Sequence, residues 1–568
     1  MKNRLSRRLW MLLVALLVVV SGLALLQSSS ETVSLKILAI NDLHGNLLPS
    51  SFRVPDPNDR TKTVAVQAGG IEALSTVVKN ARASNPNTIF VGAGDLIGAS
   101  PLVSALLRDE PTIEALSKMG MALSAVGNHE FDKGVKELLR IQNGGCDSVE
   151  PDKACKFGSY QGAQFSYIAA NVFYKNGHRP LFKPYYLAFA GSVPVAFVGA
   201  VLKDTPTIVV PSGVAGIEFT DEAEEINKVA RRLQAAGVQT IIAVIHQGGT
   251  SRDFFDVTDC STLSGPIVDI VKKLDKSVDV VISGHSHRGY RCRVDGRLVT
   301  QSDAYGHLLT EINLTIDKKT KDVVAVTSNS IVVDPSKVAK DPAMTEIVQR
   351  AKALTDPVAN QPIAKLAGEQ ITTDTSPAGE SFLGDVIADA QLWASQPADK
   401  GGAQIAFMNP GGIRAPLPPN PSPSKSVSYG DTFTVQPFGN SLVVMTLTGA
   451  QIKLLLEQQW LNQSRPRILQ VSQGFSYTWD GSKQPGDKVV AGSMMLNGQP
   501  IQADKNYRVV VNSFLADGGD NFLVLKEGKD RLGGEVDLDA LQAYLKAMEA
   551  AGKPVGPGPR DRIKVVNP

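Results

Sequence analysis

Five short stretches of the chain carry metal-binding side chains, and each one follows an apolar run. The stretches are Asp42-Leu43-His44, Gly94-Asp95, Gly127-Asn128-His129-Glu130, His246 and Gly284-His285-Ser286-His287. The runs before them are rich in Val, Ile, Leu and Ala, and predict buried strands over 35–40, 88–93, 123–126, 240–245 and 278–282. Ligands of open α/β sheets bind beyond the carboxyl ends of the strands, so we expect all five stretches to meet at one site.

The donor atoms in these stretches predict a pair of metal ions. Five of the seven histidines of the chain fall in the stretches. A zinc ion prefers four ligands, so a larger set suits two ions that share a carboxylate, and we expect Asp95 to be the bridge. Mixed imidazole and carboxylate ligation fits Zn, Mn, Co or Fe better than Ca or Mg. The seven candidate ligands are Asp42, His44, Asp95, Asn128, His246, His285 and His287.

Two neighbouring divalent ions point to the hydrolysis of a phosphate ester. Such ions lower the pKa of a bound water and neutralise charge on phosphoryl oxygens during in-line attack. His129 lies in the same stretch as a candidate ligand, and we expect it to donate a proton to a phosphoryl oxygen or to the leaving group. Asp132, three residues later, would orient that imidazole.

The elements that must hold these residues alternate in type along the chain. Residues 33–335 alternate apolar strands with amphipathic helices, at 70–82, 101–119 and 221–236, which predicts α/β layering. A chain of 568 residues is too long for one ordinary core. We therefore expect a first domain over 31–340, a linker helix within 341–361 and a second domain over 362–568. The second domain begins with a predicted helix over 380–394 and continues as α+β, with a proline-rich loop over 416–423.

The N-terminus and the cysteines indicate export. Residues 1–30 join four basic residues to an apolar stretch over 9–26, which predicts a signal peptide or an uncleaved membrane anchor. We therefore expect a periplasmic or extracellular protein that contacts a membrane only through this segment. In an oxidising compartment four cysteines favour disulfides, and we expect Cys146–Cys155 and Cys260–Cys292, although three pairings are open.

The charge balance favours small substrates over nucleic-acid polymers. The chain has 58 basic and 56 acidic residues, and without the four basic residues of the N-terminal segment the net charge is −2. A protein that binds nucleic acid needs a basic face.

The two histidines outside the five stretches, His178 and His307, are expected to be structural or solvated.

The motifs together resemble the calcineurin-like metallophosphoesterases, and within them the secreted 5′-nucleotidase and UDP-sugar hydrolase family. The resemblance implies a four-layer αββα sandwich followed by a second α+β domain. It also implies two divalent metal ions, with Zn or Mn expected, and a catalytic dyad of His129 and Asp132. By the family pattern one ion is held by Asp42, His44 and His287, the other by Asn128, His246 and His285, and Asp95 bridges them.

The resemblance extends into the second domain. Its motifs are Asn409-Pro410-Gly411-Gly412-Ile413-Arg414, Pro437-Phe438-Gly439-Asn440 and the stretch over 512–520. Two aromatics on separate loops can clamp a base, which is worth about 1–3 kcal/mol. A planar guanidinium suits a phosphate, and we expect an Asn at the base edge and an Asp at the ribose hydroxyls. The expected substrate-binding residues are Asn409, Gly412, Arg414, Phe438, Asn440, Phe514 and Asp520.

One departure from the family pattern affects the choice of substrate. Relatives carry arginines just before the helix expected over 380–394, whereas residues 371–380 contain none. We expect an exported enzyme that removes the 5′-phosphate of nucleotides or of related phosphate esters. The alternatives are a 2′,3′-cyclic nucleotide phosphodiesterase, a UDP-sugar hydrolase or a hydrolase of another phosphate or sulfate ester. A binding protein without turnover would lack metal ligands, and none of the seven is missing.

Overall fold

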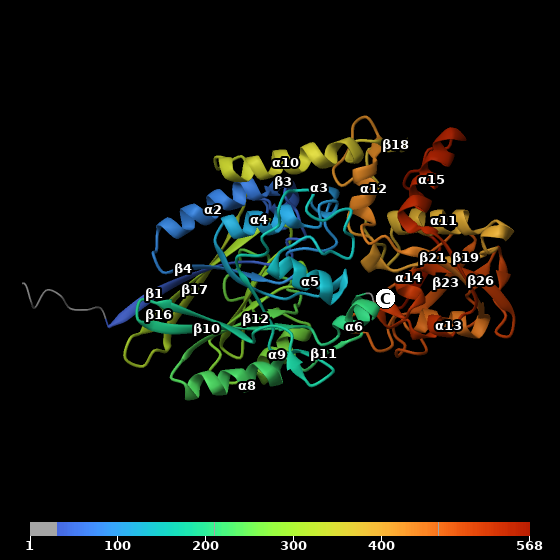
Figure 1. The fold of residues 1–568 in the computed structure, drawn as a ribbon. Coiled ribbons are helices and arrows are strands. Elements are labelled where there is room, and N and C mark those ends of the chain that lie inside the picture. Colours follow the sequence, from blue (N-terminus) through green and yellow to red (C-terminus); the bar gives the residue numbers. More distant parts are fainter. Residues whose placement is uncertain (1–30, 210, 464) are drawn as a thin grey trace, which may run out of the picture.

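The computed structural model describes residues 31–209, 211–463 and 465–568, which form two lobes joined by a long helix (Figure 1). The predicted signal or anchor segment over 1–30 lies outside the described residues. Among the helices of the described ranges, none combines the length and the apolar character needed to cross a lipid bilayer.

Two six-stranded sheets pack face to face in the first lobe. Their inner faces bury a shared apolar cluster that includes Ile37, Val91, Val195 and Val244. The first sheet has the order β17 (Val323–Val332), β16 (Leu308–Asp317), β1 (Thr32–Ile40), β4 (Thr88–Ala93), β5 (Met121–Ala125), β6 (Ser166–Ile168). The second has the order β14 (Gly289–Val294), β15 (Arg297–Ser302), β13 (Val280–Ser283), β12 (Thr240–His246), β10 (Val193–Val201), β9 (Tyr185–Ala190).

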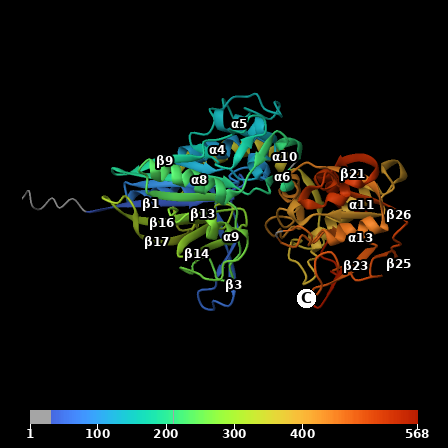
Figure 2. The ribbon, with the colours of Figure 1, turned by 90° about the horizontal axis from the view of Figure 1, so that it is seen from below.

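Helices cover the outer faces of both sheets. The helices α2 (Ile71–Ala83), α4 (Glu110–Lys118) and α5 (Gly134–Asn143) pack on the first sheet. The helices α8 (Glu222–Ala235) and α9 (Pro266–Lys273) pack on the second (Figure 2). The layers are therefore helix, sheet, sheet, helix, and the expected αββα sandwich is confirmed.

One predicted helix of the first lobe is wrong in its extent. The helix expected over 101–119 is divided into α3 (Leu102–Ala105) and α4. Arg108 and Asp109 between them adopt left-handed backbone conformations, with φ of 57° and 59°, which an α-helix does not accommodate. Pro111 then lies in the first turn of α4, where its missing N–H costs nothing.

Parallel pairing brings the predicted strands to one edge. The strand β4 pairs in parallel with β1 and β5, and β12 pairs in parallel with β10 and β13. All five strands predicted to precede a metal-binding stretch are present. Because parallel neighbours end at the same edge of a sheet, the segments that follow them leave each sheet together.

The second lobe is built on a five-stranded sheet. Its order is β22 (Gln470–Val471), β19 (Ile405–Met408), β26 (Asn506–Asn512), β21 (Ser441–Thr448), β27 (Lys529–Val536). The helices α11 (Phe382–Ser395) and α15 (Asp537–Ala550) cover one face, and α13 (Gly449–Glu457) with β23 (Phe475–Asp480) covers the other. The helix predicted over 380–394 is confirmed as α11, where the Ser381 side chain caps the first turn by accepting from Gly384 N.

The structure also contains the expected linker helix and the expected disulfides. The helix α10 (Pro342–Ala359) lies within the range predicted for a linker helix, and its buried residues Met344, Ile347 and Ala351 pack in the core of the first lobe. Both predicted disulfides are present, Cys146–Cys155 and Cys260–Cys292.

Candidate metal centre and substrate cleft

The side chains that follow the predicted strands converge on two adjacent points. Within each of two groups the donor atoms lie no more than 4.8 Å apart, and the groups are Asp42, His44 and His287, and Asp95, His246 and His285. Asn128 Oδ1 joins the second group, at 3.1 Å from His246 Nε2 and 3.0 Å from His285 Nδ1. All seven side chains that sequence analysis selected as ligands are therefore in one place.

Asp95 belongs to the second group and also faces the first. Its Oδ2 atom is 3.0 Å from His246 Nε2 in one group and 3.8 Å from His44 Nε2 in the other. His44 Nε2 in turn lies 3.1 Å from His287 Nε2. One carboxylate oxygen of Asp95 is thus close to histidines of both groups.

Hydrogen bonds to backbone carbonyl groups determine which ring nitrogens of His44 and His246 face the candidate metal groups. His246 Nδ1 lies 2.7 Å from Ala93 O, and His44 Nδ1 lies 2.7 Å from Gly98 O. A carbonyl oxygen only accepts, so Nδ1 carries a proton in both rings and Nε2 points inward. The inward nitrogen atoms of His44 and His287 are 3.1 Å apart beside carboxylate oxygens, and a cation would satisfy such a set of acceptors. The donor set therefore fits divalent metal ions.

The Asp95 carboxylate favours positive charge on the neighbouring His246 ring, whereas burial lowers the pKa of His44 and His285 well below the usual value. Asp42, His44 and His246 are fully buried, and only 1% of the surface of Asp95 is exposed. Burial lowers the pKa of His246, but Asp95, together with Asp42 and the Ala93 carbonyl, outweighs burial and raises this pKa to about 9. Buried carboxylates are costly unless a cation or strong donors compensate them.

The ligand positions are held in an unfavourable backbone conformation. Asp42, His44, Asp95, His285 and His287 all have positive φ values, between 45° and 73°. A non-glycine residue in this conformation lowers the stability of the fold by about 1–3 kcal/mol, and such residues cluster at functional sites.

Two glycines make the close approach of the ligand loops possible. A Cβ atom on Gly94 would meet the ring of His246 at 2.5 Å, and one on Gly127 would collide with the Asp95 carboxylate. Glycine is therefore required sterically at both of these motif positions.

A histidine–aspartate pair stands beside the metal groups. His129 Nδ1 lies 2.9 Å from Asp132 Oδ2, and the His129 backbone N–H donates to Asp95 Oδ1 at 2.8 Å. Burial lowers the pKa of His129, but the charges of Asp132 and Asp95 outweigh burial and raise it above its usual value. Both side chains line the cleft, so the ring can hold a proton next to a bound phosphate.

Glu130, in the same stretch, has a structural role. Its buried carboxylate accepts from the backbone N–H groups of Asp95, Leu96 and Gly127, at 2.9, 2.8 and 2.7 Å. These bonds tie the loop after β4 to the loop after β5. Glu130 therefore helps to fix the position of Asp95.

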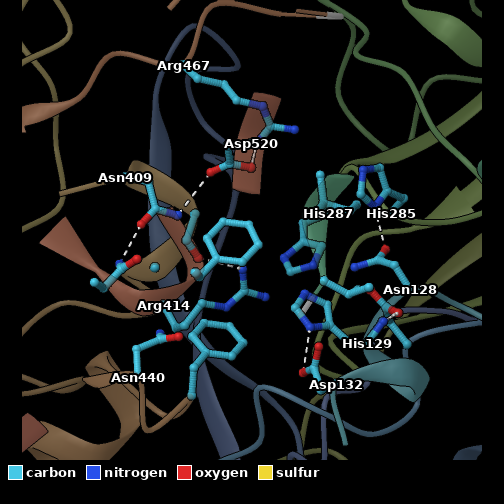
Figure 3. Close-up of a pocket in the computed structure, with 18 of the residues that line it drawn as sticks. Asn128, His129, Asp132, His285, His287, Asn409, Arg414, Asn440, Arg467 and Asp520 are labelled. Carbon is cyan, nitrogen blue, oxygen red and sulfur yellow. Dashed lines mark hydrogen bonds and ion pairs between the residues drawn. The ribbon is translucent and has the colours of Figure 1, made fainter. Parts of the chain in front are cut away.

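The second lobe closes the site into a cavity of about 310 Å³ (Figure 3). One wall carries Asp95, Asn128, His129, Asp132, His285 and His287 from the first lobe. All seven substrate-binding residues expected from the sequence line the opposite wall, namely Asn409, Gly412, Arg414, Phe438, Asn440, Phe514 and Asp520. Asp42, His44 and His246 lie buried behind the first wall.

Arg414 presents unpaired donors to this cavity. Its Nε and Nη2 atoms are buried without a hydrogen-bond partner among the described residues, and only Nη1 donates, to Gly411 O at 3.4 Å. The guanidinium carbon lies 5.8 Å from the centre of the Phe438 ring, and that ring lies 5.8 Å from the His129 ring. Arg414 thus reaches toward the metal-binding wall from the opposite lobe.

Sequence analysis missed several residues of the cavity. Arg465 and Arg467 lie on the segment between α13 and β22, and Ile208 and Val209 lie at the end of the short helix α6 (Thr205–Ile208). The only feature of the sequence that could have pointed to these arginines is the pair of basic residues on either side of Pro466. They follow no predicted strand and lie in no glycine motif.

The remaining two histidines are away from the metal groups. His307 is held between Ser50 Oγ at 2.7 Å and Asp303 Oδ2 at 3.0 Å. His178 is exposed and pairs with Glu218. Their expected structural or solvated roles are confirmed.

Comparison with known proteins identifies the family. The calcineurin-like phosphoesterase model matches residues 35–289, and the 5′-nucleotidase C-terminal domain model matches residues 360–527. The cell wall protein Lmo0130 of Listeria monocytogenes is 33% identical over 559 residues, which cover 93% of this chain and 69% of that protein. Endonuclease YhcR of Bacillus subtilis is 33% identical over 537 residues, which cover 94% of this chain and 41% of that longer protein.

A solved structure agrees with these matches. The 5′-nucleotidase precursor from Thermus thermophilus has a TM-score of 0.74 at 27% identity, over 94% of this chain and 100% of that one. The chain therefore belongs to the 5′-nucleotidase family of calcineurin-like metallophosphoesterases, a family of metal-dependent phosphoester hydrolases.

Proposed function

We propose that the protein is an exported 5′-nucleotidase that hydrolyses a nucleotide to a nucleoside and phosphate. One observation carries the proposal: a single cavity has the two candidate metal groups on one wall, and on the other wall two phenylalanines and an arginine with two unpaired donor atoms. In this proposal residues 31–340 perform the chemistry, residues 362–568 bind the nucleoside, and the helix within 341–361 connects them.

The phosphate end of the substrate would lie between the two lobes. The seven ligand side chains would hold two divalent ions, Zn or Mn, which supply positive charge and a water of lowered pKa. Arg414 would donate from Nε and Nη2 to phosphoryl oxygens, since these two atoms have no other described partner. His129 would give a proton to the leaving oxygen, and Asp132 would keep its ring in place.

The nucleoside end would lie against the second lobe. Phe438 and Phe514 line the cavity from different loops and would stack on the two faces of the base. Asn440 would bond the edge of the base. Asp520 already accepts from Arg467 and from Asn409 Nδ2, at 2.8 and 3.0 Å, and its remaining lone pairs would accept from ribose hydroxyls.

Export is supported by several independent features. The chain has an apolar stretch over 9–26, two disulfides and a relative whose name places it in a cell wall. Disulfides persist mainly outside the reducing cytosol. We propose a periplasmic or extracellular location on these grounds.

The experiment that tests the function is phosphate release by the purified protein, reconstituted with Mn or Zn, from nucleoside 5′-monophosphates. The comparison panel is a 2′,3′-cyclic nucleotide, UDP-glucose and single-stranded DNA. We expect the highest kcat/KM for a 5′-monophosphate or another nucleotide with a 5′-phosphoryl group. A higher kcat/KM for the cyclic nucleotide or for DNA would overturn the proposal.

A further inference from the structure

The N-terminal segment joins the first lobe at the edge of the sheets that lies opposite the metal groups. The strand β1 begins at Thr32, and the metal ligands follow its other end. Lys318 N donates to Glu31 O at 2.8 Å, so the turn between β16 and β17 lies beside this entry point. A Cβ atom on Gly191, in the turn between β9 and β10, would lie 3.7 Å from Val33. We call the residues 31–33, 190–192 and 317–322 the entry edge, and Figure 2 shows β1, β9 and β16 at the end of the first lobe that lies away from the second lobe.

The chain before the entry edge holds an apolar stretch with only a short connection to the fold. Residues 9–26 are apolar over a length near that needed to cross a bilayer, and the basic residues before them favour the cytoplasmic side. From Leu26 to Glu31 an extended chain reaches at most about 18 Å. The headgroup layer on each side of a bilayer is itself about 5–8 Å thick. An anchor made of residues 9–26 therefore holds the entry edge against the lipid headgroups.

The strand β9, which leads into the entry edge, presents an uncovered apolar row. Side chains alternate between the two faces of a strand, and Tyr186 and Ala188 pack against the cluster between the sheets. The three residues that point the other way are Tyr185, Leu187 and Phe189, which are 39%, 42% and 59% exposed. Neighbouring exposed apolar side chains of this kind mark interaction surfaces, and aromatic rings favour the headgroup level of a bilayer. The row therefore fits a lipid surface beside the entry edge.

The same end of the lobe carries an excess of positive charge. Eight basic residues lie in the segments 231–232, 272–276 and 318–321, and none of them forms an ion pair within the part of the chain that the structure describes. Asn227 Nδ2 of α8 donates to Lys273 O at 2.8 Å, and Thr240 Oγ1 at the start of β12 donates to Lys321 O at 2.7 Å, so these segments are joined to the same end. Five acidic residues lie beside them, in 275–279, in 317–322 and at Glu31. The remaining positive charge favours anionic lipid headgroups.

We propose that residues 9–26 stay attached as a membrane anchor and that the entry edge, with the outward row of β9, docks on an anionic lipid bilayer. The inference goes beyond the proposed function and rests on the proposed export. Because the metal groups lie at the opposite edge of the same sheets, the substrate cleft faces the solution in this arrangement.

The test places a fluorescent label in the row of β9 in the full chain, reconstituted into phosphatidylcholine vesicles with and without phosphatidylglycerol. The label is attached to Phe189→Cys, which is selective because the four native cysteines form two disulfides. The control is Leu454→Cys on α13 of the second lobe, where the native side chain is also apolar and exposed. With a nitroxide on the lipid headgroups, we expect quenching at position 189 to exceed that at position 454 at least about fivefold in the anionic vesicles.

Equal quenching at the two positions overturns the docking face. A label at position 189 that is shielded from solvent without quenching by the lipid nitroxide overturns it as well, because the row then contacts another protein surface, such as a second copy of the chain.

The charge is tested by adding Lys318→Gln and Lys319→Gln to the labelled protein. The control pair is Lys546→Gln with Lys564→Gln, two exposed lysines of the second lobe. At a salt concentration that releases half of the parent protein from the anionic vesicles, the first pair should lower the ratio of docked to released protein at least about tenfold. The control pair should leave this ratio unchanged. Equal effects of the two pairs overturn docking through the entry edge.

Failure of the docking and failure of the function give different results. Mass spectrometry of the protein from the membrane fraction of its native host should find residues 9–26 still attached. An exported protein that begins after residue 30 overturns the docking, while the proposed nucleotidase stands. Phosphate release from AMP by the same vesicles tests the function separately, and its absence leaves the quenching result intact.

Discussion

His129 Nδ1 lies 2.9 Å from Asp132 Oδ2, so the dyad is formed within one short turn beside the metal groups. His129 is not among the side chains whose donor atoms converge on either group. We predict that His129→Ala lowers kcat about 10²–10⁴-fold, the range for loss of a general acid, while the metal content stays unchanged. Steady-state kinetics and elemental analysis of the same sample check both parts.

Asp132→Asn is the matched variant for the dyad. It keeps the size of the side chain but removes the charge that holds the His129 proton, so kcat should fall about 10–100-fold, again with full metal content. A variant at either position that loses its metals would contradict the assignment of both residues to the dyad.

The two phenylalanines of the cavity give a prediction about binding. Phe438→Ala and Phe514→Ala each remove a stacking surface worth about 1–3 kcal/mol, so KM for nucleotides should rise roughly 5–150-fold. Hydrolysis of p-nitrophenyl phosphate, which has no base, should change little. The clamp would be refuted by parallel losses on the nucleotide and on the small ester.

Asp95 gives a prediction about the metals, because it belongs to the second group and also faces the first. Asp95→Asn removes the charge of the shared carboxylate, and we expect the protein to lose at least one of its ions together with its activity. Asp132→Asn serves as the control, since it also removes a carboxylate of the cavity. Equal metal content in the two variants would show that Asp95 does not bridge.

A buried carboxyl group far from the metals gives a prediction about pH. Burial raises the pKa of Asp385 to about 8, and Glu380 adds to the rise while Arg562 opposes it. Between pH 3.8 and about pH 8 the folded protein keeps a proton that the unfolded chain releases. The free energy of unfolding therefore falls as the pH rises through this window, by up to about 1.4 kcal/mol per pH unit from this group.

Asp385→Asn should remove that contribution, because the amide mimics the protonated acid. The stability of the variant relative to the wild type should increase steadily from about pH 5 to about pH 8. Urea unfolding of both proteins at several pH values measures the difference. A difference that does not change with pH would show that Asp385 is not protonated in the folded protein.

The sequence predicted the metal wall more completely than the substrate wall. The strands before Asp42, Asp95 and His246 are continuous apolar runs, and the fold requires their carboxyl ends to meet. Arg465 and Arg467 have no such marker, because their position depends on the pairing of Arg467 with Asp520, far along the chain. The break between α3 and α4 also escaped prediction, since Arg108 and Asp109 are not residues that interrupt a helix by themselves.

The central claim is that seven side chains from five strand ends hold two metal ions. Elemental analysis of the purified, extensively dialysed protein tests it most directly, with the metal content expressed per chain. We predict about two equivalents of Zn or Mn per chain after reconstitution, and their loss together with phosphate release after chelation. A protein that releases phosphate from nucleotides at full rate with less than one equivalent of metal would contradict the account.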